Sequence, residues 1–380
     1  MREVQLGDVV SRVATRNSVG NENVLTISAV HGLVNQREFF NRRIASADVS
    51  QYYLLERGDF AYNKSYSDGW PVGVVRQLER YESGVVSPLY ICFRPHREKV
   101  SPEFLQHYFD SGVLDDAIRD IAKEGVRNHG LLNVRVPDFF SLKMILPSPE
   151  EQRNIAEILD EVDEQLAGLR SVRAKAAHWL QGVRRRLISE QGDGELVEIG
   201  RLGQVVTGRT PDAGPRLGQG DGVPFVTPSE IVDGESVLDS AREARRGDFN
   251  VVEIPSGSTL VVCIGFGTGK VGLLGHSACV NQQINAVIPG EGVDPHFLFH
   301  AICEASAKIK VASSLQVTPI VNKSTFSQIQ VMAPPSLPRQ QEISRVLLQA
   351  SLYLDQVDAN IEKVKHLKRA LMDGLLAGTG

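Results

Sequence analysis

The glycine-rich run Gly265–Lys270 (GFGTGK) is the stretch of this chain that could bind a phosphate group or a nucleotide cofactor. A phosphate-binding loop has the spacing Gly-x-x-x-x-Gly-Lys-Ser/Thr, because its backbone N–H groups surround the phosphates and its hydroxyl binds magnesium. Ile264 and Val271 occupy the first glycine position and the Ser/Thr position of that pattern. A strand rather than a helix is expected to follow, so the run predicts no nucleotide or S-adenosylmethionine site.

Patterns typical of a catalytic or metal site are also absent from the sequence. The pair Pro334-Pro335 is flanked by alanine and serine, so it does not complete the Asn/Asp-Pro-Pro-Tyr/Phe motif of amino-methyltransferases. No Asp…Glu-x-Lys cluster of the nuclease type stands out in a strand context. The cysteines are too scattered for a zinc site or a disulfide framework, and we expect buried apolar residues at Cys92, Cys263, Cys279 and Cys303.

Polar side chains with paired donors and acceptors lie instead on expected loops, where they could read the edges of nucleic-acid bases. The alternative is that these loops are solvated turns, or that their side chains satisfy backbone groups at strand ends. In the first half of the chain the candidate DNA-binding residues are Asn63, Lys64, Ser65, Tyr66, Arg127, Asn128 and His129. In the second half they are Thr268, Lys270, Gln282, Gln283, Gln316 and Thr318.

The segments that carry these loops, residues 1–146 and 195–332, resemble each other. Residues 56–75 align with 254–274 as a strand, a turn and a strand, with Gly58 opposite Gly257 and Gly73 opposite Gly272. Short β-branched runs bounded by glycine and proline predict strands, and helical patterns intervene at 102–121 and 295–310. Each segment is therefore expected to form a mixed α/β domain, and the chain reads as a tandem duplication.

Two long helices are expected at 147–190 and 333–380, each entered through prolines and each following one globular segment. Their apolar residues recur at steps of three and four, the pattern of a coiled-coil seam. The seam residues are Leu159, Val162, Leu166, Leu169, Ala176, Leu180, Val183 and Leu187 in the first helix, and Leu347, Ala350, Leu354, Val357, Ile361, Val364, Leu371 and Leu375 in the second.

The two seams share one irregularity, a basic residue at Arg173 and at Lys368, 195 positions apart (368 − 173). Asp163 and Asp358 are separated by the same interval. A helix of about 38 residues would be roughly 57 Å long and could not bury such a stripe alone, so the seams are expected to pack on each other. The second helix carries an insertion of about one heptad near Leu347–Leu354, and this leaves the pairing register open.

Composition limits the function classes further. The chain has 380 residues and a net charge of −5, which is not typical of a strongly basic nucleic-acid binder. Any DNA contacts must therefore gather basic residues on one face, or a partner must supply the contacts to phosphate. No apolar run long enough to span a membrane occurs, and we expect a cytoplasmic protein without membrane association.

The architecture and one proline-rich phrase carry a family resemblance. Residues 147–152 (PSPEEQ), and less faithfully 335–340 (PSLPRQ), enter the long helices with a proline-rich phrase that ends in Glu-Gln in the first copy. Together with the duplicated globular segments, this phrase resembles the specificity subunit of type I restriction–modification systems over the whole chain. The second phrase lacks the glutamate.

The resemblance implies an α+β fold with an internal pseudo-two-fold repeat. Residues 1–146 and 195–332 would be two target recognition domains, separated by two long helices, 147–190 and 333–380, that form an antiparallel coiled coil. It also implies a non-catalytic subunit that reads an asymmetric bipartite site in double-stranded DNA and docks two methyltransferase subunits. Restriction and translocase subunits would join through the complex, with S-adenosylmethionine, ATP and magnesium bound only by the partner subunits.

Three alternatives stay open at the level of sequence. The chain could be a target recognition protein of another phage-defence or orphan methylation system. It could be a structural coiled-coil adaptor, which would show no sequence preference for DNA. It could also be a modification enzyme that uses Gly265–Lys270 for its cofactor, although the missing catalytic motif argues against this reading.

Overall fold

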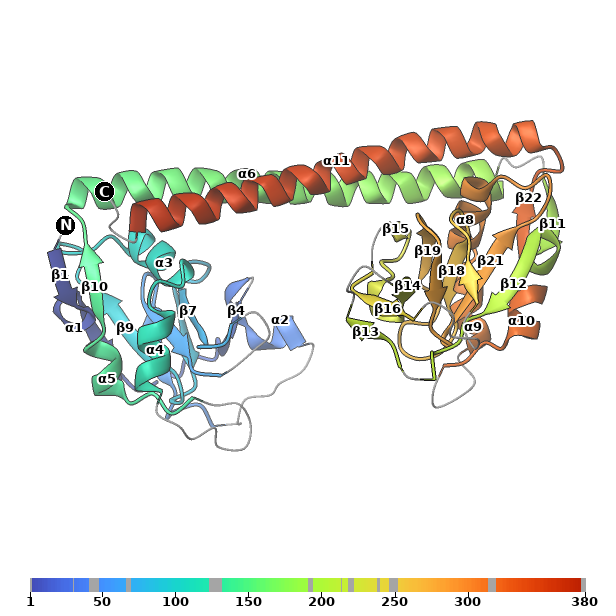
Figure 1. The fold of residues 1–380 in the computed structure, drawn as a ribbon. Coiled ribbons are helices and arrows are strands. Elements are labelled where there is room, and N and C mark those ends of the chain that lie inside the picture. Colours follow the sequence, from blue (N-terminus) through green and yellow to red (C-terminus); the bar gives the residue numbers. More distant parts are fainter. Residues whose placement is uncertain are drawn as a thin grey trace. The chain divides into compact units, whose positions relative to one another are not determined.

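A computed structural model describes residues 2–29, 31–40, 48–65, 70–122, 132–190, 194–212, 214–217, 222–237, 240–245, 252–313 and 319–376. The chain forms two compact units (Figure 1). The first comprises Met1–Gly168 with Ile361–Gly380, and the second comprises Leu169–Asn360. Each unit therefore contains one globular segment and a part of each long helix.

The first unit is built on an antiparallel four-stranded sheet of order β2-β9-β6-β7. Its strands are β2 (Val10–Val13), β9 (Ile91–Pro95), β6 (Phe60–Asn63) and β7 (Val74–Gln77). Antiparallel ribbons pair β1 (Arg2–Gln5) with β10 (Lys143–Leu146), β3 (Leu25–Ser28) with β4 (Gly32–Asn35), and β5 (Tyr53–Glu56) with β8 (Ser83–Val86). The strands are short and rich in β-branched and aromatic residues, as the sequence predicts.

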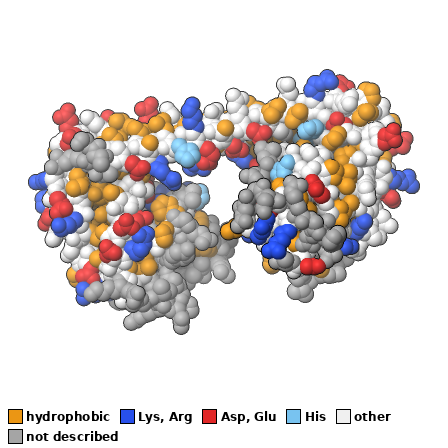
Figure 2. Space-filling view, in the orientation of Figure 1, with side chains coloured by type: hydrophobic (Ala, Val, Ile, Leu, Met, Phe, Trp, Pro, Cys, Tyr) orange, Lys and Arg blue, Asp and Glu red, His pale blue; other side chains and the backbone are white. Residues whose placement is uncertain are grey.

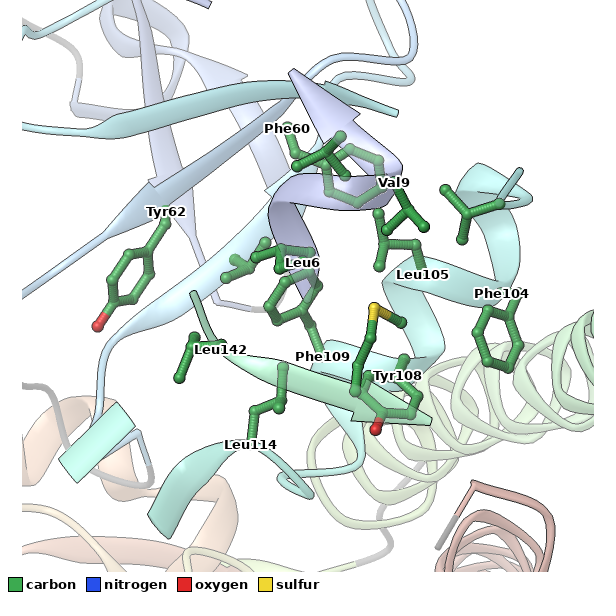
Figure 3. Packing of buried hydrophobic residues seen from close by; sticks show 14 of the residues in the cluster. Leu6, Val9, Phe60, Tyr62, Phe104, Leu105, Tyr108, Phe109, Leu114 and Leu142 are labelled. Atoms are coloured by element: carbon green, nitrogen blue, oxygen red, sulfur yellow. The ribbon is translucent and has the colours of Figure 1, made fainter. Parts of the chain in front are cut away.

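The short helices of the first unit are α1 (Leu6–Val9), α2 (Gln36–Phe40), α3 (Pro102–Asp110), α4 (Asp115–Ile121) and α5 (Val136–Phe140). Of these, α2 lies beside β4 and has no buried residue. The helical pattern at 102–121 is thus two helices, because Gly112 adopts a left-handed φ of 75° between them. Figure 3 shows Leu6, Val9, Phe60 and Leu105 among the residues of the core that α1 and α3 form with the sheet.

The second unit contains a five-stranded sheet of order β12-β21-β18-β19-β15. Its strands are β12 (Gly203–Thr207), β21 (Ile284–Pro289), β18 (Thr259–Val262), β19 (Val271–Leu274) and β15 (Glu235–Val237). A second sheet contains β13 (Arg216–Leu217), β16 (Arg242–Ala244), β14 (Val223–Val226), β20 (Ala278–Val280) and β17 (Glu253–Ile254), and a ribbon pairs β11 (Glu195–Glu198) with β22 (Gln330–Ala333). The helices are α7 (Ile199–Leu202), α8 (Pro295–Glu304), α9 (Ser306–Ser313), α10 (Lys323–Gln328) and the 3₁₀ turn Pro228–Glu230.

The two units repeat one topology. The sheet order β2-β9-β6-β7 of the first unit recurs as β12-β21-β18-β19 in the second. Gly58 and Gly257 open equivalent strands with φ values of 95° and 81°, which confirms their alignment. The alignment of Gly73 with Gly272 is wrong, because Gly269 precedes β19 with a φ of 89° as Gly73 precedes β7 with 84°.

The long helices are α6 (Pro149–Arg185), which continues as a π-helical turn over Arg186–Glu190, and α11 (Leu337–Leu376). In the first unit Ile155 and Leu159 of α6 share a core with Met372 and Leu376 of α11. In the second unit Leu180 of α6 shares a core with residues near the start of α11. The start of each helix therefore lies beside the end of the other, so the pairing is antiparallel (Figure 1).

In both units the predicted seam residues of α6 and α11 are buried or half-buried. Leu159, Val162, Leu166, Leu180, Leu347, Ala350, Val357 and Ile361 are buried. Leu169, Ala176, Val183, Leu187, Leu354, Val364, Leu371 and Leu375 are half-buried. Such a seam stabilises the pair by removing apolar surface from water.

The basic residues that interrupt the seam form ion pairs across it. In the first unit the Lys368 ammonium lies 2.6 and 2.7 Å from the two carboxylate oxygens of Asp163. In the second unit Arg173 Nε lies 2.7 Å from Asp358 Oδ1, and Arg173 also donates to Glu235 at 2.9 Å. The four residues noted for their equal spacing in the sequence are therefore two copies of one interhelical pair.

A buried glutamine joins each long helix to its globular domain. Gln152 Nε2 donates to the Pro147 carbonyl at 3.0 Å, and Gln152 Oε1 accepts from the N–H of Ser101 at 2.8 Å, the residue that caps α3. Gln340 repeats both bonds with Pro334 at 2.9 Å and with Asp294, the cap of α8, at 3.0 Å.

These glutamines also locate the heptad insertion in the second helix. They lie 188 positions apart (340 − 152), whereas the ion-paired residues lie 195 apart (368 − 173), a difference of seven. The insertion therefore falls between the glutamine and the ion pair, and one whole heptad leaves the seam in phase.

Candidate nucleic-acid interface

In the first unit the predicted residues Asn63, Lys64 and Ser65 lie at the end of β6, and Asn63 is the last residue of that strand. Asn63 Oδ1 accepts from the N–H of Ser65 at 3.1 Å, which bends the chain as it leaves the strand. The Lys64 ammonium lies 3.4 Å from the Val134 carbonyl, and partial burial lowers the pKa of Lys64 from its usual value. Tyr66 lies outside the described residues.

The same strand end meets the segment that precedes α5. The N–H of Leu132 donates to the Lys64 carbonyl at 2.9 Å. Leu132 is the first described residue after 123–131, the segment that contains Arg127, Asn128 and His129, and these three lie outside the described residues. Lys64, a member of the first predicted cluster, is therefore hydrogen-bonded to the residue that directly follows the segment containing the second predicted cluster.

In the second unit the equivalent turn, between β18 and β19, is held by its own hydrogen bonds. Thr268 Oγ1 donates to the Gly265 carbonyl at 2.6 Å, and the N–H of Gly269 donates to the Val262 carbonyl at 2.9 Å. Thr268 is buried, so its hydroxyl supports the turn. Lys270 is half-buried, and among the described residues no ion-pair partner lies within reach of its ammonium.

The turn between β20 and β21 contributes the second predicted cluster. Gln283 Nε2 donates to the Ile264 carbonyl at 3.4 Å, which joins this turn to the one between β18 and β19. Gln282 is exposed and accepts a hydrogen bond from the hydroxyl of Thr210. Asn281 Nδ2 donates to the same hydroxyl at 3.2 Å, so Thr210 in the loop after β12 belongs to this group.

The third predicted cluster, Gln316 and Thr318, lies outside the described residues. Pro319, the first described residue after them, accepts a hydrogen bond from the N–H of Gly265 at 2.9 Å. The two described clusters of the second unit, and the residue that follows the third, are thus in contact with one another. Loops that are distant in the sequence meet at one end of the sheet, which is the arrangement that a groove-reading surface requires.

The hydrogen bonding of Gly265–Lys270 argues against phosphate binding. The N–H groups of Gly265, Thr268, Gly269 and Lys270 all donate to carbonyl groups of the protein. A phosphate cradle needs such groups to be free and to lead into a helix, whereas β19 follows here. Within the described residues no cluster of three or more His, Cys, Asp or Glu side chains could hold a metal ion.

The chain is similar to known proteins in both sequence and fold. A family model described as the type I restriction modification DNA specificity domain matches residues 192–369. A protein named as the specificity subunit of the type I restriction enzyme MjaX, from Methanocaldococcus jannaschii, is 24% identical over 372 residues, covering 88% of this chain and 81% of that protein. The chain is therefore similar to the specificity subunits of type I restriction–modification systems.

Solved structures support the fold of the chain. One, from work on complex assembly and conformational transition of the type I R-M system, has a TM-score of 0.59 at 18% identity and covers 98% of this chain and 97% of that one. The S subunit from M. genitalium has a TM-score of 0.57 at 12% identity, with coverage of 99% and 96%. The predicted fold, with two mixed α/β domains and paired long helices, is confirmed.

The structure adds residues to the candidate interface that sequence reasoning missed. Phe266 at the tip of the turn is fully exposed, at 105% relative accessibility. Arg209, beside Thr210, is exposed, and so is Lys310 of α9, whose aliphatic chain lies against Gly269. The position of Phe266 between two glycines could have indicated an exposed aromatic residue from the sequence alone. Arg209 and Lys310 approach the turn only through tertiary packing, which the sequence does not show.

Charge is mixed along the two long helices. In the view of Figure 2, acidic and basic side chains are interspersed over α6 and α11. No helix in the described part of the chain combines the length and the apolar character that a membrane span requires.

Proposed function

We propose that this specificity subunit selects an asymmetric, bipartite DNA target, with each globular unit reading one half-site. The observation that carries the proposal is the repeated placement of polar loop residues. In each unit they gather around the end of an equivalent strand, β6 in the first and β18 in the second. Backbone atoms and buried side chains fix these loops, so their exposed amides and cations can serve as donors and acceptors for base edges.

The two units should read different sequences because their loops differ. The first offers Asn63, Lys64 and Ser65 at the end of its strand, and the second offers Lys270 with the amides of Gln282 and Gln283. A duplicated fold with diverged loops predicts two half-sites that are not palindromic copies of each other.

The subunit itself should be non-catalytic, and S-adenosylmethionine, ATP and magnesium should bind to its partner subunits. This rests on the sequence, which lacks an amino-methyltransferase motif, and on the turn Gly265–Lys270, whose N–H groups are already used within the protein. The complex would act on DNA in the cytoplasm together with restriction and translocase subunits.

Two methyltransferase subunits should dock on the long helices. Ile158 and Tyr353 lie 195 positions apart and are 42% and 51% exposed, and Val172 and Leu367 repeat that interval at 40% and 52%. Each lies immediately before a seam position. Apolar residues exposed at repeat-related positions indicate two similar contacts for two copies of one partner.

The stoichiometry can be tested in the purified complex of this chain with its methyltransferase. Replacing Ile158 and Leu367, both in the first unit, with aspartate should remove one methyltransferase copy, and native mass spectrometry should detect that loss. Ala167→Asp, an exposed position on the other side of the same helix, is the control and should keep both copies. Loss of both copies, or of neither, from the double variant would refute two independent docking sites.

The specificity role is tested by sequencing methylated bases in cells. Cells carrying this gene with its methyltransferase should show a split adenine motif that disappears when only this gene is deleted. The motif would also supply both half-sites. An unchanged methylation pattern, with the methyltransferase shown to be expressed, would contradict the proposal and favour a structural adaptor.

A further inference from the structure

The turn between β18 and β19 presents an aromatic ring to solvent. Phe266 has 105% relative accessibility, the highest value among the exposed large apolar residues that the structure describes. Phenylalanine is one of the side chains that gain most from leaving water. No described part of the chain covers this ring, so its exposure needs an explanation outside the fold.

The turn below the ring is fixed at several points. The N–H of Gly265 is bonded to Pro319 and its carbonyl to the Thr268 hydroxyl, at 2.9 and 2.6 Å. The Gly269 carbonyl accepts from Ser306 Oγ of α9 at 2.7 Å. Phe266 is thus carried on a braced turn, and little backbone entropy would be lost when the ring meets a partner.

Glycine occupies the two positions beside Phe266 for different reasons. Gly265 has a φ of 92°, in the left-handed region, so the turn itself requires glycine there. Gly267 has no such φ, and a Cβ added to it would meet its nearest neighbour, Val262, at 3.6 Å, an ordinary contact. The fold does not require glycine at 267, but a close approach of another molecule to the backbone would.

The surroundings of the ring indicate the chemistry of that molecule. Lys270 belongs to the same turn, and the stem of Lys310 lies against Gly269. Gln283 reaches the turn with its amide, and Gln282 is exposed beside it. Cations and amides near the ring could contact the anionic phosphates and the polar base edges of DNA. The ring itself could contact the flat apolar faces of the stacked bases.

We propose that Phe266 is a wedge that enters the base stack of the half-site bound by the second unit, while Gly267 lets the DNA approach the turn. This inference rests on the proposed function and assigns a role in site selection to a residue without hydrogen-bonding groups. Steps that unstack easily, such as pyrimidine–purine steps, would be favoured at that point without any contact to a base edge.

The test uses the full chain bound to its methyltransferase, with duplexes that carry 2-aminopurine at successive steps of the second half-site. The wild-type complex should raise the fluorescence at one step, and Phe266→Ala should abolish that rise and weaken binding about tenfold. The slope of log affinity against log salt should stay unchanged, because no phosphate contact is lost. Gly267→Ala should weaken binding without lowering thermal stability.

Two control variants separate the effect of the Phe266 ring from that of another exposed apolar side chain and from that of a nearby cation. Leu196→Ala removes another apolar side chain of the same unit, 56% exposed on β11, and should leave DNA binding and fluorescence unchanged. Lys310→Ala should reduce the salt slope by about one without changing the fluorescence rise.

The inference is overturned if the wild-type complex binds its site specifically but produces no unstacking at any step, or if Phe266→Ala leaves the rise intact. A second outcome would also overturn it. If no step unstacks, and replacing one thymine with uracil weakens binding as much as Phe266→Ala does, the ring contacts the C5-methyl group of that thymine instead. Loss of methyltransferase from the Phe266→Ala complex would identify a protein contact instead. Failure of the wild-type complex to prefer any sequence would count against the proposed function itself.

Discussion

At the residue scale, Gln152 and Gln340 explain why a glutamine closes the phrase that enters each long helix. Each is buried, and each holds the backbone just before a helix of its globular domain. The neighbouring glutamate acts more locally, since Glu151 Oε2 accepts from the N–H of Ser148 at 2.8 Å in a capping arrangement. Arg339 at the equivalent position pairs with Glu342 instead, while its N–H still donates to the Ser336 hydroxyl at 3.4 Å. The second phrase therefore lacks only the glutamate's half of the capping arrangement, and the connection to the domain is intact.

Gln152→Ala should destabilise the first unit by about 1–3 kcal/mol, because the N–H of Ser101 and the Pro147 carbonyl would lose their buried partner. Urea unfolding followed by circular dichroism would measure the change. Gln165→Ala, which removes an exposed glutamine from the same helix, should change stability by less than about 0.5 kcal/mol. Equal effects of the two substitutions would refute the role given to Gln152.

A buried histidine in α8 should make stability depend on pH. Burial, with Arg184 and His296 adding positive charge nearby, lowers the pKa of His300 from 6.5 to about 3. Below about pH 6.5 the unfolded chain binds a proton that the folded chain does not, so the free energy of unfolding falls as the pH falls toward 3. Between pH 7 and 5.5 this one group should remove about 1 kcal/mol.

The measurement compares urea unfolding of wild type and His300→Gln at both pH values. The variant should lose about 1 kcal/mol less than the wild type over that interval, whatever its stability at pH 7. An identical loss in the two proteins would show that His300 is protonated in the folded state as readily as in the unfolded one.

At the element scale, periodicity determined what could be predicted. The three–four spacing placed the seam residues correctly, because a helix of this length can bury only one stripe. It could not assign partners to Arg173 and Lys368, since an ion pair across two helices depends on their register. Likewise, β6 and β7 could be located, but the alignment of Gly73 with Gly272 failed because the two turns differ in length.

The double substitution Leu166→Ala with Ile361→Ala should loosen the helix pair in the first unit. Both side chains are buried, 4% and 6% exposed, and each truncation should cost about 2–5 kcal/mol. Scanning calorimetry would detect the lowered transition, and Ile158→Ala, an exposed position on the same helix, would serve as the control. Unchanged thermal stability in the double variant would show that the seam is not a packed interface.

At the scale of the whole molecule, duplication is the property that sequence reasoning recovered best. The repeated glycines, strands and seams are required by the fold, so they survive divergence as a recognisable pattern. The candidate interface was only partly predictable, because loop residues such as Thr210 and Lys310 join the turn at 264–270 through tertiary contacts alone. The side chain of Thr268, expected at the interface, is instead buried in the turn that supports it.

If each unit reads its own half-site, a loop substitution should affect one half of the target and leave the other unchanged. Lys270→Ala should relax one base position in the second half-site, at a cost of about 1–3 kcal/mol in discrimination, because a lysine can donate to guanine acceptors in the major groove. Methylation by the assembled complex of a library randomised in both half-sites would measure this, position by position. Lys308→Ala, whose ammonium bonds to the Gln330 carbonyl at 3.0 Å, is the matched control in the same unit. Relaxation in the first half-site would contradict independent reading, and a uniform loss over all sequences would show that Lys270 contacts phosphate and carries no sequence information.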